Sequence, residues 1–132
     1  MLKGKYIFLI EDDPVNFSVI RTILIGKGAI VPLDHWGDIT LKQMKLCPPL
    51  DLIIIDLMLP GNVTGYDVFE AIKKDPELKN IPTVVVSASD PDIEIPKARE
   101  KGFNGFISKP INRHKFPQQL LDIMNGENIW GE

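Results

Sequence analysis

The chain has 132 residues, of which 44% are hydrophobic and 25% charged, as in ordinary soluble globular proteins. This length predicts one domain with a core that is covered on two faces. The formal net charge of −3, without a basic stripe, argues against nucleic acid or an anionic membrane as a partner. No apolar run approaches the roughly 18 residues that are needed to cross a bilayer.

The first residues and the cysteine content both favour the cytoplasm. Residues 1–5 are basic but lead directly into a short apolar run, without the longer apolar segment and small-residue cleavage site of a signal peptide. The single cysteine, Cys47, cannot form an internal disulfide. We therefore expect a cytoplasmic protein.

Apolar runs alternate with amphipathic stretches along the chain, which predicts repeated strand–helix units and a parallel sheet. The expected strands cover residues 5–10, 29–33, 51–55, 82–87 and 104–107. The expected helices cover residues 14–27, 37–46, 65–74, 92–102 and 113–125. The fold class is therefore α/β, a doubly wound five-stranded parallel sheet with helices on both faces.

Local signals support the first helix and raise questions about the fourth and fifth. Asp13 suits an N-cap, with Pro14 at the first helical position. Pro96 falls inside the expected fourth helix, so we expect that helix to begin near Ile95 or to be kinked. Pro117 marks the true first turn of the fifth helix.

Polar side chains follow four of the expected strands, at the point where each strand ends. The most apolar run, Leu52–Ile55, leads into Asp56, and a carboxylate in that place is costly unless it emerges into a polar site. The other three strands lead into Glu11-Asp12-Asp13, Ser87 and Lys109. Parallel strands end at one edge of a sheet, where sites form in open α/β folds, so we expect these side chains to lie together.

This set of residues has the chemistry that phosphoryl transfer to a carboxylate requires. Glu11, Asp12 and Asp56 supply hard oxygen ligands of the kind that Mg²⁺ prefers, with Mn²⁺ as an alternative ion. Asp56 can attack phosphorus as a nucleophile and form an aspartyl phosphate. The metal ion, the Lys109 ammonium and the Ser87 hydroxyl can then each neutralise a phosphoryl oxygen.

Four stretches of the chain together carry a family resemblance. They are Phe8-Leu9-Ile10-Glu11-Asp12-Asp13-Pro14-Val15-Asn16, Asp51-Leu52-Ile53-Ile54-Ile55-Asp56-Leu57-Met58-Leu59-Pro60-Gly61, Val86-Ser87-Ala88 and Phe106-Ile107-Ser108-Lys109-Pro110. In order, spacing and place they resemble the receiver domain of two-component response regulators, in its single-domain, chemotaxis-regulator-like form. The resemblance covers about residues 5–125. It implies that residues 1–132 form a single receiver domain of the flavodoxin-like type with strand order 2-1-3-4-5. Residues 126–132 are then a tail that either stays loose or packs back.

The resemblance implies a metal site around the phosphoacceptor. Asp56 matches the phosphoacceptor itself. Glu11 and Asp12 match the acidic pair, with Asp12 as a direct metal ligand and Glu11 acting through water. The backbone carbonyl of Met58 matches the third protein ligand of the metal.

The resemblance also implies a switch. Ser87 matches the hydroxyl that follows the phosphoryl group, and Phe106 matches the aromatic residue that turns inward in response. Lys109 matches the lysine that contacts the phosphoryl group, and the Lys109–Pro110 peptide bond is expected to be cis.

The partners and the mode of output follow from the same resemblance. A sensor histidine kinase or a histidine phosphotransfer protein would donate the phosphoryl group from phosphohistidine. The new charge would change the surface of the fourth helix, fifth strand and fifth helix. No output domain follows in the sequence, so we expect a downstream protein to be bound in trans by a monomer or weak dimer. The chain would not be an enzyme beyond its own phosphorylation and dephosphorylation.

The loop after the phosphoacceptor departs from the family pattern. Thr64-Gly65 places the loop glycine one residue farther from Asp56 than is usual. Met58 and Ser89 match positions that influence the attack of water on the aspartyl phosphate. Since Met58 offers no acid or amide to orient that water, we expect the phosphorylated form to last minutes or longer.

Two other classes of protein share parts of this pattern. A Mg²⁺-dependent phosphohydrolase of the haloacid dehalogenase type also uses an aspartate nucleophile, but it needs a second Asp where this chain has Met58. A flavodoxin-like flavin protein needs a phosphate loop rich in Ser, Thr and Gly, where Glu11-Asp12-Asp13 would instead repel a phosphate. The phosphohydrolase is the main alternative.

Overall fold

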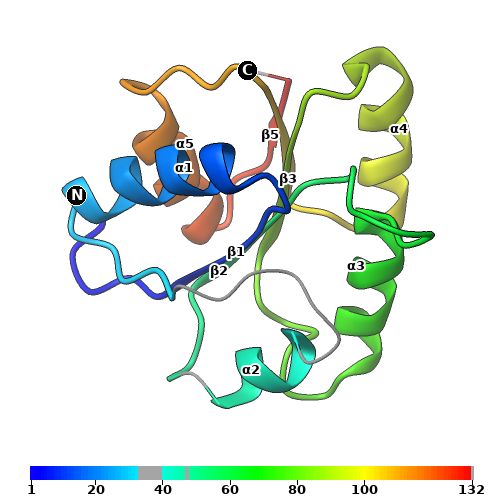
Figure 1. The fold of residues 1–132 in the computed structure, drawn as a ribbon, viewed down its shortest axis with the longest axis horizontal. Helices are drawn as coiled ribbons and strands as arrows, with labels where there is room; N and C mark the ends of the chain where they lie inside the picture. The colour runs from blue at the N-terminus through cyan, green and yellow to red at the C-terminus, as the bar shows by residue number, and fades with distance from the viewer. Residues whose placement is uncertain (33–39, 47, 132) are drawn as a thin grey trace.

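The computed structural model describes residues 1–32, 40–46 and 48–131. In this part of the chain, five parallel strands form one sheet, in the order β1 (Ile7–Ile10), β2 (Leu52–Ile55), β3 (Thr83–Ser87), β4 (Gly105–Ser108) and β5 (Ile129–Trp130). The helices are α1 (Pro14–Gly26), α2 (Thr40–Leu46), α3 (Gly65–Lys74), α4 (Pro91–Lys101) and α5 (Phe116–Met124). Figure 1 shows α1 and α5 on one side of the sheet and α3 and α4 on the other. The predicted α/β class, with helices on both faces of a parallel sheet, is confirmed.

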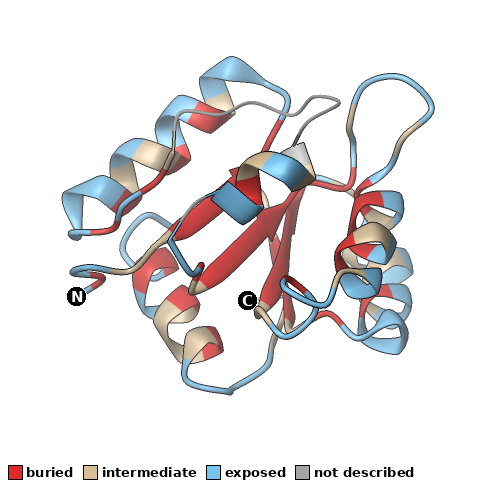
Figure 2. Ribbon diagram, turned by 90° about the horizontal axis from the view of Figure 1, so that it is seen from below, coloured by how far each residue is buried: buried red, intermediate tan, exposed pale blue. Residues whose placement is uncertain are grey.

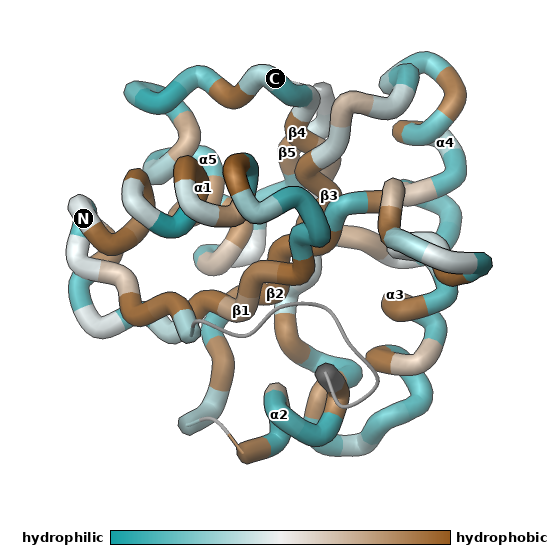
Figure 3. The backbone as a smooth tube through the Cα atoms, in the orientation of Figure 1, coloured by the Kyte–Doolittle hydropathy of each residue, from teal (hydrophilic) through white to brown (hydrophobic). Residues whose placement is uncertain are grey.

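The central strands are apolar on both faces because helices cover both faces. Neighbouring residues of a strand point to opposite sides, so Ile7 packs with α1 and α5 while Phe8 packs with α3 and α4. All residues of β1, β2 and β3 are buried. Figure 2 shows this buried centre in red, and Figure 3 shows that the same strands are the most hydrophobic part of the chain.

The predicted strand 29–33 is present only as a single bridge, so this prediction was wrong in extent. Ile30 pairs in parallel with Tyr6 beside β1, which is the predicted position in the sheet. The Ile30 N–H donates to the Lys5 carbonyl over 2.8 Å. Pro32 lacks an N–H donor, which limits further pairing at this edge. When the Ile30 bridge is counted as the predicted second strand, the five predicted strands lie in the predicted order 2-1-3-4-5, and β5 is an additional strand beyond the last of them.

The fifth strand of the sheet comes from the segment after α5. The sequence predicted that this tail, residues 126–132, either stays loose or packs back. After α5, Gly126 adopts a positive φ of 100° and the chain turns toward β4. Ile129 then pairs with Gly105, and Trp130 with Phe106. The segment therefore packs back as β5.

The helix boundaries agree with the predicted ranges to within a few residues. Asp13 caps α1, since its side chain accepts the Val15 N–H over 2.8 Å. The helix α4 runs from Pro91 through Pro96, so the predicted start near Ile95 was wrong. The described part of the chain does not include residues 37–39 of the predicted second helix, residue 33 of the predicted second strand, or Cys47. No helix in the described ranges has the length and apolarity to span a bilayer.

The last helix confirms the proline signal in the sequence. The helix α5 begins at Phe116, and Pro117 lies in its first turn, where a missing N–H costs no helical hydrogen bond.

Candidate functional site

The carboxyl ends of four strands meet at one edge of the sheet and bring four predicted side chains together. Glu11 follows β1, Asp56 follows β2, Ser87 ends β3 and Lys109 follows β4. Backbone hydrogen bonds align these ends. The Asp56 N–H donates to the Ile10 carbonyl over 3.0 Å, and the Lys109 N–H donates to the Ser87 carbonyl over 2.9 Å. The parallel topology therefore brings the four side chains into one hydrogen-bonded group, in which Ser87 reaches Asp56 and Lys109 reaches both Asp56 and Glu11.

Asp56 is 7% exposed, and its carboxylate accepts hydrogen bonds from three donors. The Ser87 hydroxyl donates to Oδ1 over 3.0 Å, and the Met58 backbone N–H donates to the same oxygen over 3.1 Å. The Lys109 ammonium donates to Oδ2 over 3.0 Å. Burial of this carboxylate is tolerated because its charge faces a cation and its oxygens have donors.

Glu11 is the second buried carboxylate of the site, at 2% exposure. Its Oε1 accepts from the Lys109 ammonium over 2.5 Å, and its Oε2 accepts from the Asp13 N–H over 3.1 Å. Lys109 therefore lies between two carboxylates, Glu11 and Asp56. The Lys109–Pro110 peptide bond is cis, which confirms that prediction.

The mutual contacts shift the proton affinities of Glu11 and Lys109. Burial raises the pKa of Glu11, the Asp56 charge adds to this rise, and hydrogen bonds from Lys109 and Asp13 oppose it. Burial by itself would lower the pKa of Lys109, but the hydrogen bonds and charges of Glu11 and Asp56 together raise it. Lys109 is therefore a cation at neutral pH, and it balances one of the two acidic groups that it contacts.

A pair of hydroxyl groups extends the site away from Asp56. The Ser87 side chain is fully buried, and its one hydroxyl hydrogen is donated to Asp56. The Ser89 Oγ lies 3.1 Å from the Ser87 Oγ and must be the donor in that contact, because the Ser87 hydrogen is already used. The Ser89 N–H also points to the Ser87 Oγ, over 3.3 Å.

The loop that follows Asp56 is closed by a glycine that has no room for a side chain. A Cβ added to Gly65 would lie 2.5 Å from the Asp56 carbonyl oxygen and 2.9 Å from Leu57 Cα. The Gly65 N–H donates to the Leu57 carbonyl over 3.0 Å, and Met58 pairs with Thr64 in an antiparallel bridge. The extra loop residue is thus accommodated between Met58 and Thr64, and Asp56 stays in place.

Two predicted residues stand apart from this hydrogen-bonded group. The Asp12 side chain is exposed to solvent. Phe106 is fully buried in the core on the α3 and α4 side. The Met58 backbone N–H donates to Asp56. The role expected for the Met58 backbone carbonyl, as a ligand of the metal ion, stays a prediction.

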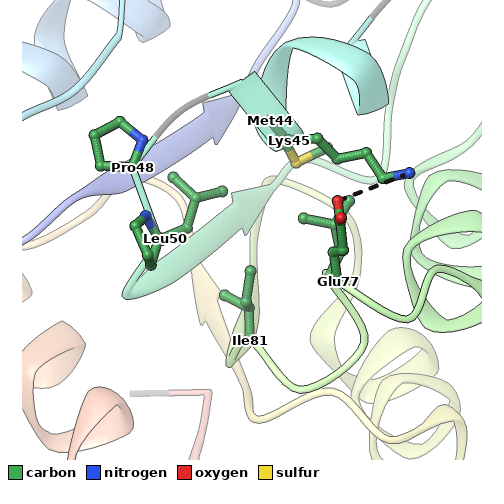
Figure 4. A pocket seen from close by; sticks show the side chains of 8 residues that line it. Met44, Lys45, Pro48, Leu50, Glu77 and Ile81 are labelled. Carbon is green, nitrogen blue, oxygen red and sulfur yellow. Dashed lines mark ion pairs between the residues drawn. The ribbon is translucent and has the colours of Figure 1, made fainter.

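A separate hollow lies at the opposite end of the sheet, where the strands begin. Figure 4 shows it between the end of α2 and the segments that precede β2 and β3. Its labelled lining residues are Met44, Lys45, Pro48, Leu50, Glu77 and Ile81. The lining is mostly apolar, and the Lys45 ammonium lies 4.0 Å from Glu77. Lys45 also lies 2.7 Å from Asp75, but the two buried carboxylates among the described residues, Glu11 and Asp56, lie at the other end of the sheet.

A family model described as "Response regulator receiver domain" matches residues 7–121. The chain belongs to the response regulator receiver domain family. Two curated relatives agree with this assignment. The polar-differentiation response regulator DivK of Brucella ovis is 30% identical over 120 residues, which are 91% of this chain and 96% of DivK. The two-component response regulator ORR7 of Oryza sativa subsp. japonica is 31% identical over 106 residues, or 80% of this chain, and the match spans only 50% of ORR7.

Solved receiver domains have the same fold. The receiver domain of sensor histidine kinase PA1611 from Pseudomonas aeruginosa PAO1 has a TM-score of 0.78 and 25% identity, covering 93% of this chain and 99% of that one. That crystal structure holds a magnesium ion coordinated in its active site cleft. The chemotaxis protein CheY4 of Vibrio cholerae has a TM-score of 0.78 at 18% identity, covering 90% and 98%, and shows likeness of fold alone.

The side chains of this receiver domain fit a magnesium ion chemically. Within the described ranges, no three His, Cys, Asp or Glu side chains form a group that could hold a metal by themselves. Mg²⁺ does not need such a group, since it keeps several waters and is held by one or two carboxylates. Glu11 and Asp56 carry one more negative charge than Lys109 balances, and Asp12 is exposed beside them. Hard oxygen donors and a residual negative charge suit a divalent cation.

Proposed function

We propose that this receiver domain is a phosphoacceptor response regulator and that Asp56 is its phosphorylated residue. The observation that carries the proposal is the set of donors on the Asp56 carboxylate. Ser87 reaches one oxygen and Lys109 the other, from two different strands. These donors are of the types that stabilise developing charge on a transferred phosphoryl group.

The phosphoryl group would come from phosphohistidine on a sensor histidine kinase or a histidine phosphotransfer protein. An Asp56 carboxylate oxygen attacks phosphorus, the new O–P bond forms as the N–P bond of phosphohistidine breaks, and the imidazole nitrogen leaves with its electron pair. Lys109 and Ser87 donate to phosphoryl oxygens once they release the carboxylate. The chain acts here as a substrate of transfer, not as an enzyme with its own turnover.

Four groups of the chain would hold the metal ion. They are the side chains of Glu11, Asp12 and Asp56 and the backbone carbonyl of Met58. When bound, Mg²⁺, or Mn²⁺ in its place, supplies positive charge for the phosphoryl oxygens. Glu11 is now held by Lys109, so we expect it to act on the metal through water, with Asp12 as the direct ligand. Lys109 must then give up one of its hydrogen bonds to Glu11 and Asp56 in order to contact the phosphoryl group.

The phosphoryl donor would dock beside the α1 end of the site. Val15 is 69% exposed, Val19 43% and Met58 66%, so exposed apolar side chains lie on α1 and in the loop that follows Asp56. Val19 also lines a hollow of about 190 Å³ between α1 and the Lys109–Pro110 loop. Exposed apolar groups around a charged centre are typical of protein–protein contact surfaces.

Output would pass from Ser87 through the paired strands to a downstream protein. When the Ser87 hydroxyl turns from Asp56 to a phosphoryl oxygen, β3 and β4 adjust together, since Ser87 pairs with Ser108. Phe106 on β4 is the proposed aromatic switch. The partner would read the surface formed by α4, β4 and α5. We also propose that the protein is cytoplasmic, and a monomer or weak dimer.

Intact-mass measurement after incubation with acetyl phosphate and Mg²⁺ tests this proposal. We expect the mass to rise by one phosphoryl group, and we expect Asp56→Asn to remove that rise without changing the far-UV circular dichroism spectrum. Asp13→Asn is the matched control, because Asn caps helices as well as Asp does and the change lies next to the site. Labelling that persists in Asp56→Asn would place the acceptor elsewhere. Repeated release of phosphate from a small ester would instead favour the phosphohydrolase.

A further inference from the structure

The segment after α5 closes an edge of the sheet that would otherwise be open. Ile129 and Trp130 pair in parallel with Gly105 and Phe106 of β4. The Gly131 N–H donates to the Phe106 carbonyl over 2.8 Å. Figure 1 shows β5, in red, alongside the sheet near the C-terminus. Without this segment, β4 would present unpaired N–H and C=O groups to solvent.

The two side chains of β5 pack into the two layers of the core. Ile129 packs on the α1 and α5 side, whereas Trp130 packs on the α3 and α4 side. The Arg99 guanidinium lies over the Trp130 ring, 4.9 Å from its centroid. A strand added to a sheet edge must place alternate side chains on opposite faces in this way. The β4 edge therefore offers one apolar position on each face and an arginine above the aromatic position.

Gly105 shapes this edge for close approach of a second backbone. A Cβ at position 105 would lie 2.7 Å from the Ile129 carbonyl oxygen. Gly105 does not have the positive φ that requires glycine. A side chain is therefore excluded by the neighbouring strand and by Ile123, whose Cδ1 would lie 3.1 Å from the added Cβ.

The hold of β5 on this edge is weaker than that of the central strands. The strand has two residues, and both side chains are only partly buried. All residues of β2 and β3 are buried, by contrast. Segments with few buried contacts and exposed backbone hydrogen bonds open locally before the rest of a domain.

We propose that the edge of β4 is a docking surface for an extended strand of a partner protein, and that residues 129–131 occupy it until the partner displaces them. The occupant seen here defines the chemistry of the partner segment. It pairs in parallel, with a β-branched or similar apolar residue beside Gly105 and an aromatic residue beneath Arg99. Backbone hydrogen bonds to β4 would supply affinity, and the two side-chain positions would supply selectivity. The β4 edge is part of the surface of α4, β4 and α5 proposed above for the downstream partner, and the present proposal rests on that one, although peptide binding to the edge does not require phosphorylation of Asp56.

A peptide with the sequence of residues 127–132, carrying a fluorophore at its N-terminus, tests the surface by fluorescence anisotropy. The full chain with Ile129→Gly and Trp130→Gly keeps the backbone but loses the side chains that hold β5. We expect this opened variant to bind the peptide at least about ten-fold more tightly than the wild-type chain, in which the tethered segment competes. Equal binding to both chains, or no saturable binding to the opened variant, would overturn the proposal.

Glycine substitutions provide the matched controls. Adding Gly105→Ala to the opened variant should weaken peptide binding at least about ten-fold, because the new Cβ meets the incoming backbone. Gly26→Ala is the same chemical change at a site where the added Cβ would meet no atom within 4 Å outside its own helical turn, and it should leave binding unchanged. If neither variant loses binding, the peptide binds elsewhere. If both variants lose binding, the loss reflects a damaged fold. Either result would contradict the proposal.

A second measurement keeps the proposal testable if the opened variant does not fold. With Trp36→Phe, Trp130 is the only tryptophan. Gly105→Ala in that background should increase acrylamide quenching of Trp130, and Gly26→Ala should not. Unchanged quenching in Gly105→Ala would mean that position 105 does not control the edge.

A second copy of this chain is the competing occupant. Sedimentation of the wild-type chain would then show a concentration-dependent dimer that Gly105→Ala abolishes. That result would contradict a separate partner, since the same edge would be filled by the strand of another copy.

Discussion

Lys109 balances the charge of the proposed phosphoacceptor site. Its ammonium contacts both Glu11 and Asp56, and its side chain is 14% exposed, against 3% and 9% for the two acids. Removing a single partner from a buried ionic group leaves the others without compensation. In the resting site the lysine therefore has a structural role that precedes any contact with a phosphoryl group.

Lys109→Met should lower the free energy of unfolding by about 3 kcal/mol near neutral pH. The pKa of Glu11 is already raised by burial, and loss of the ammonium raises it further. A folded-state pKa above the unfolded value favours the native state below the unfolded pKa, and this benefit is lost as pH rises through the folded pKa. The deficit relative to wild type should thus be largest at neutral pH and shrink toward about pH 4.

Urea unfolding across that pH range, with and without Mg²⁺, measures this deficit. Lys42→Met, which changes an exposed lysine of α2, is the control and should cost little at any pH. A deficit in Lys109→Met that stays constant with pH would contradict the proposed charge balance.

Gly65→Ala should destabilise the domain, although alanine normally favours helices. The added Cβ would lie 2.9 Å from Ile55 Cγ2 and closer still to the Asp56 backbone. Overpacking of this kind costs about 1–3 kcal/mol. Chemical denaturation of Gly65→Ala beside Gly26→Ala, which has open space around it, isolates the steric cost. Equal stability of the two variants would show that the loop can move aside.

The side chain of Met58 is the basis of a prediction about the lifetime of the phosphorylated form. Its side chain is 66% exposed beside Asp56 and has no group that can orient water for attack. We expect the phosphorylated chain to last minutes or longer, and we expect Met58→Asn to shorten that lifetime severalfold. Decay of the phosphorylated mass with time measures both. A half-life of seconds in the wild-type chain would contradict this account.

At the scale of elements, α4 contains an interruption that the fold tolerates. Pro96 lies in the helix interior and is exposed, so its ring removes a helical hydrogen bond without adding to the core. The helix nevertheless continues from Pro91 to Lys101, and both of its ends are capped. Asp90 caps the start by accepting the Asp92 N–H over 2.9 Å, and Gly102 ends it with a φ of 102°. These caps hold the helix on both sides of the proline.

Pro96→Ala should therefore stabilise the protein by about 2 kcal/mol. Alanine is more favourable than proline inside a helix, and part of this gain is offset because the unfolded chain has more conformational entropy without the proline. Pro91→Ala is the matched control, because a proline at the first helical position removes no helical hydrogen bond. Thermal unfolding of the two variants compares them. A loss of stability in Pro96→Ala would mean that the proline ring makes contacts that the helix needs.

The sequence predicted the central strands and helices well because their signals are long or redundant. Leu52–Ile55 has the short, isoleucine-rich apolar pattern that favours a strand buried on both faces, and α1 is marked by its cap and its proline. The edges of the sheet were predicted less well. Ile30 and Ile129–Trp130 are short apolar segments whose pairing depends on what neighbouring segments leave free. Local sequence cannot rank such pairings, since the energy lies in distant contacts.

The position of the site could be predicted from the topology of the sheet more than from any single residue. Strand ends of a parallel sheet must converge, so Asp56, Ser87 and Lys109 could be placed together before the structure was known. The contact between Lys109 and Glu11 could not be predicted, because it depends on side-chain conformation. The role of Ser89 as a donor to Ser87 was missed for the same reason.

For the whole molecule, the sheet separates two hydrophobic layers of different make-up. One layer joins α1 and α5 to the sheet, and the other joins α2, α3 and α4. The second layer contains a stacked aromatic pair, Phe69 and Phe103, with ring centroids 3.7 Å apart. Every buried side-chain nitrogen and oxygen among the described residues has a hydrogen-bond partner. Stability should therefore be highest in the strands that both layers share.

Hydrogen exchange should reflect this arrangement. We expect the amides of β1, β2 and β3 to exchange only through global unfolding, since their residues are all buried. The amides of Trp130 and Gly131 should exchange much faster, through local opening of β5. Mass spectrometry of peptic fragments resolves the two regions. Equal protection of β5 and β2 would show that the edge strand opens only with the whole domain.

The closure of β4 by residues 129–131 also bears on how the protein behaves in a crowded solution. A bare parallel strand edge is a template on which identical chains can align and form insoluble aggregates. Residues 129–131 of the same chain cover that edge in every copy. Because they are covalently attached, they do not have to reach the edge by diffusion. If a partner displaces this segment as proposed, its own strand replaces residues 129–131, so the edge stays covered throughout the exchange.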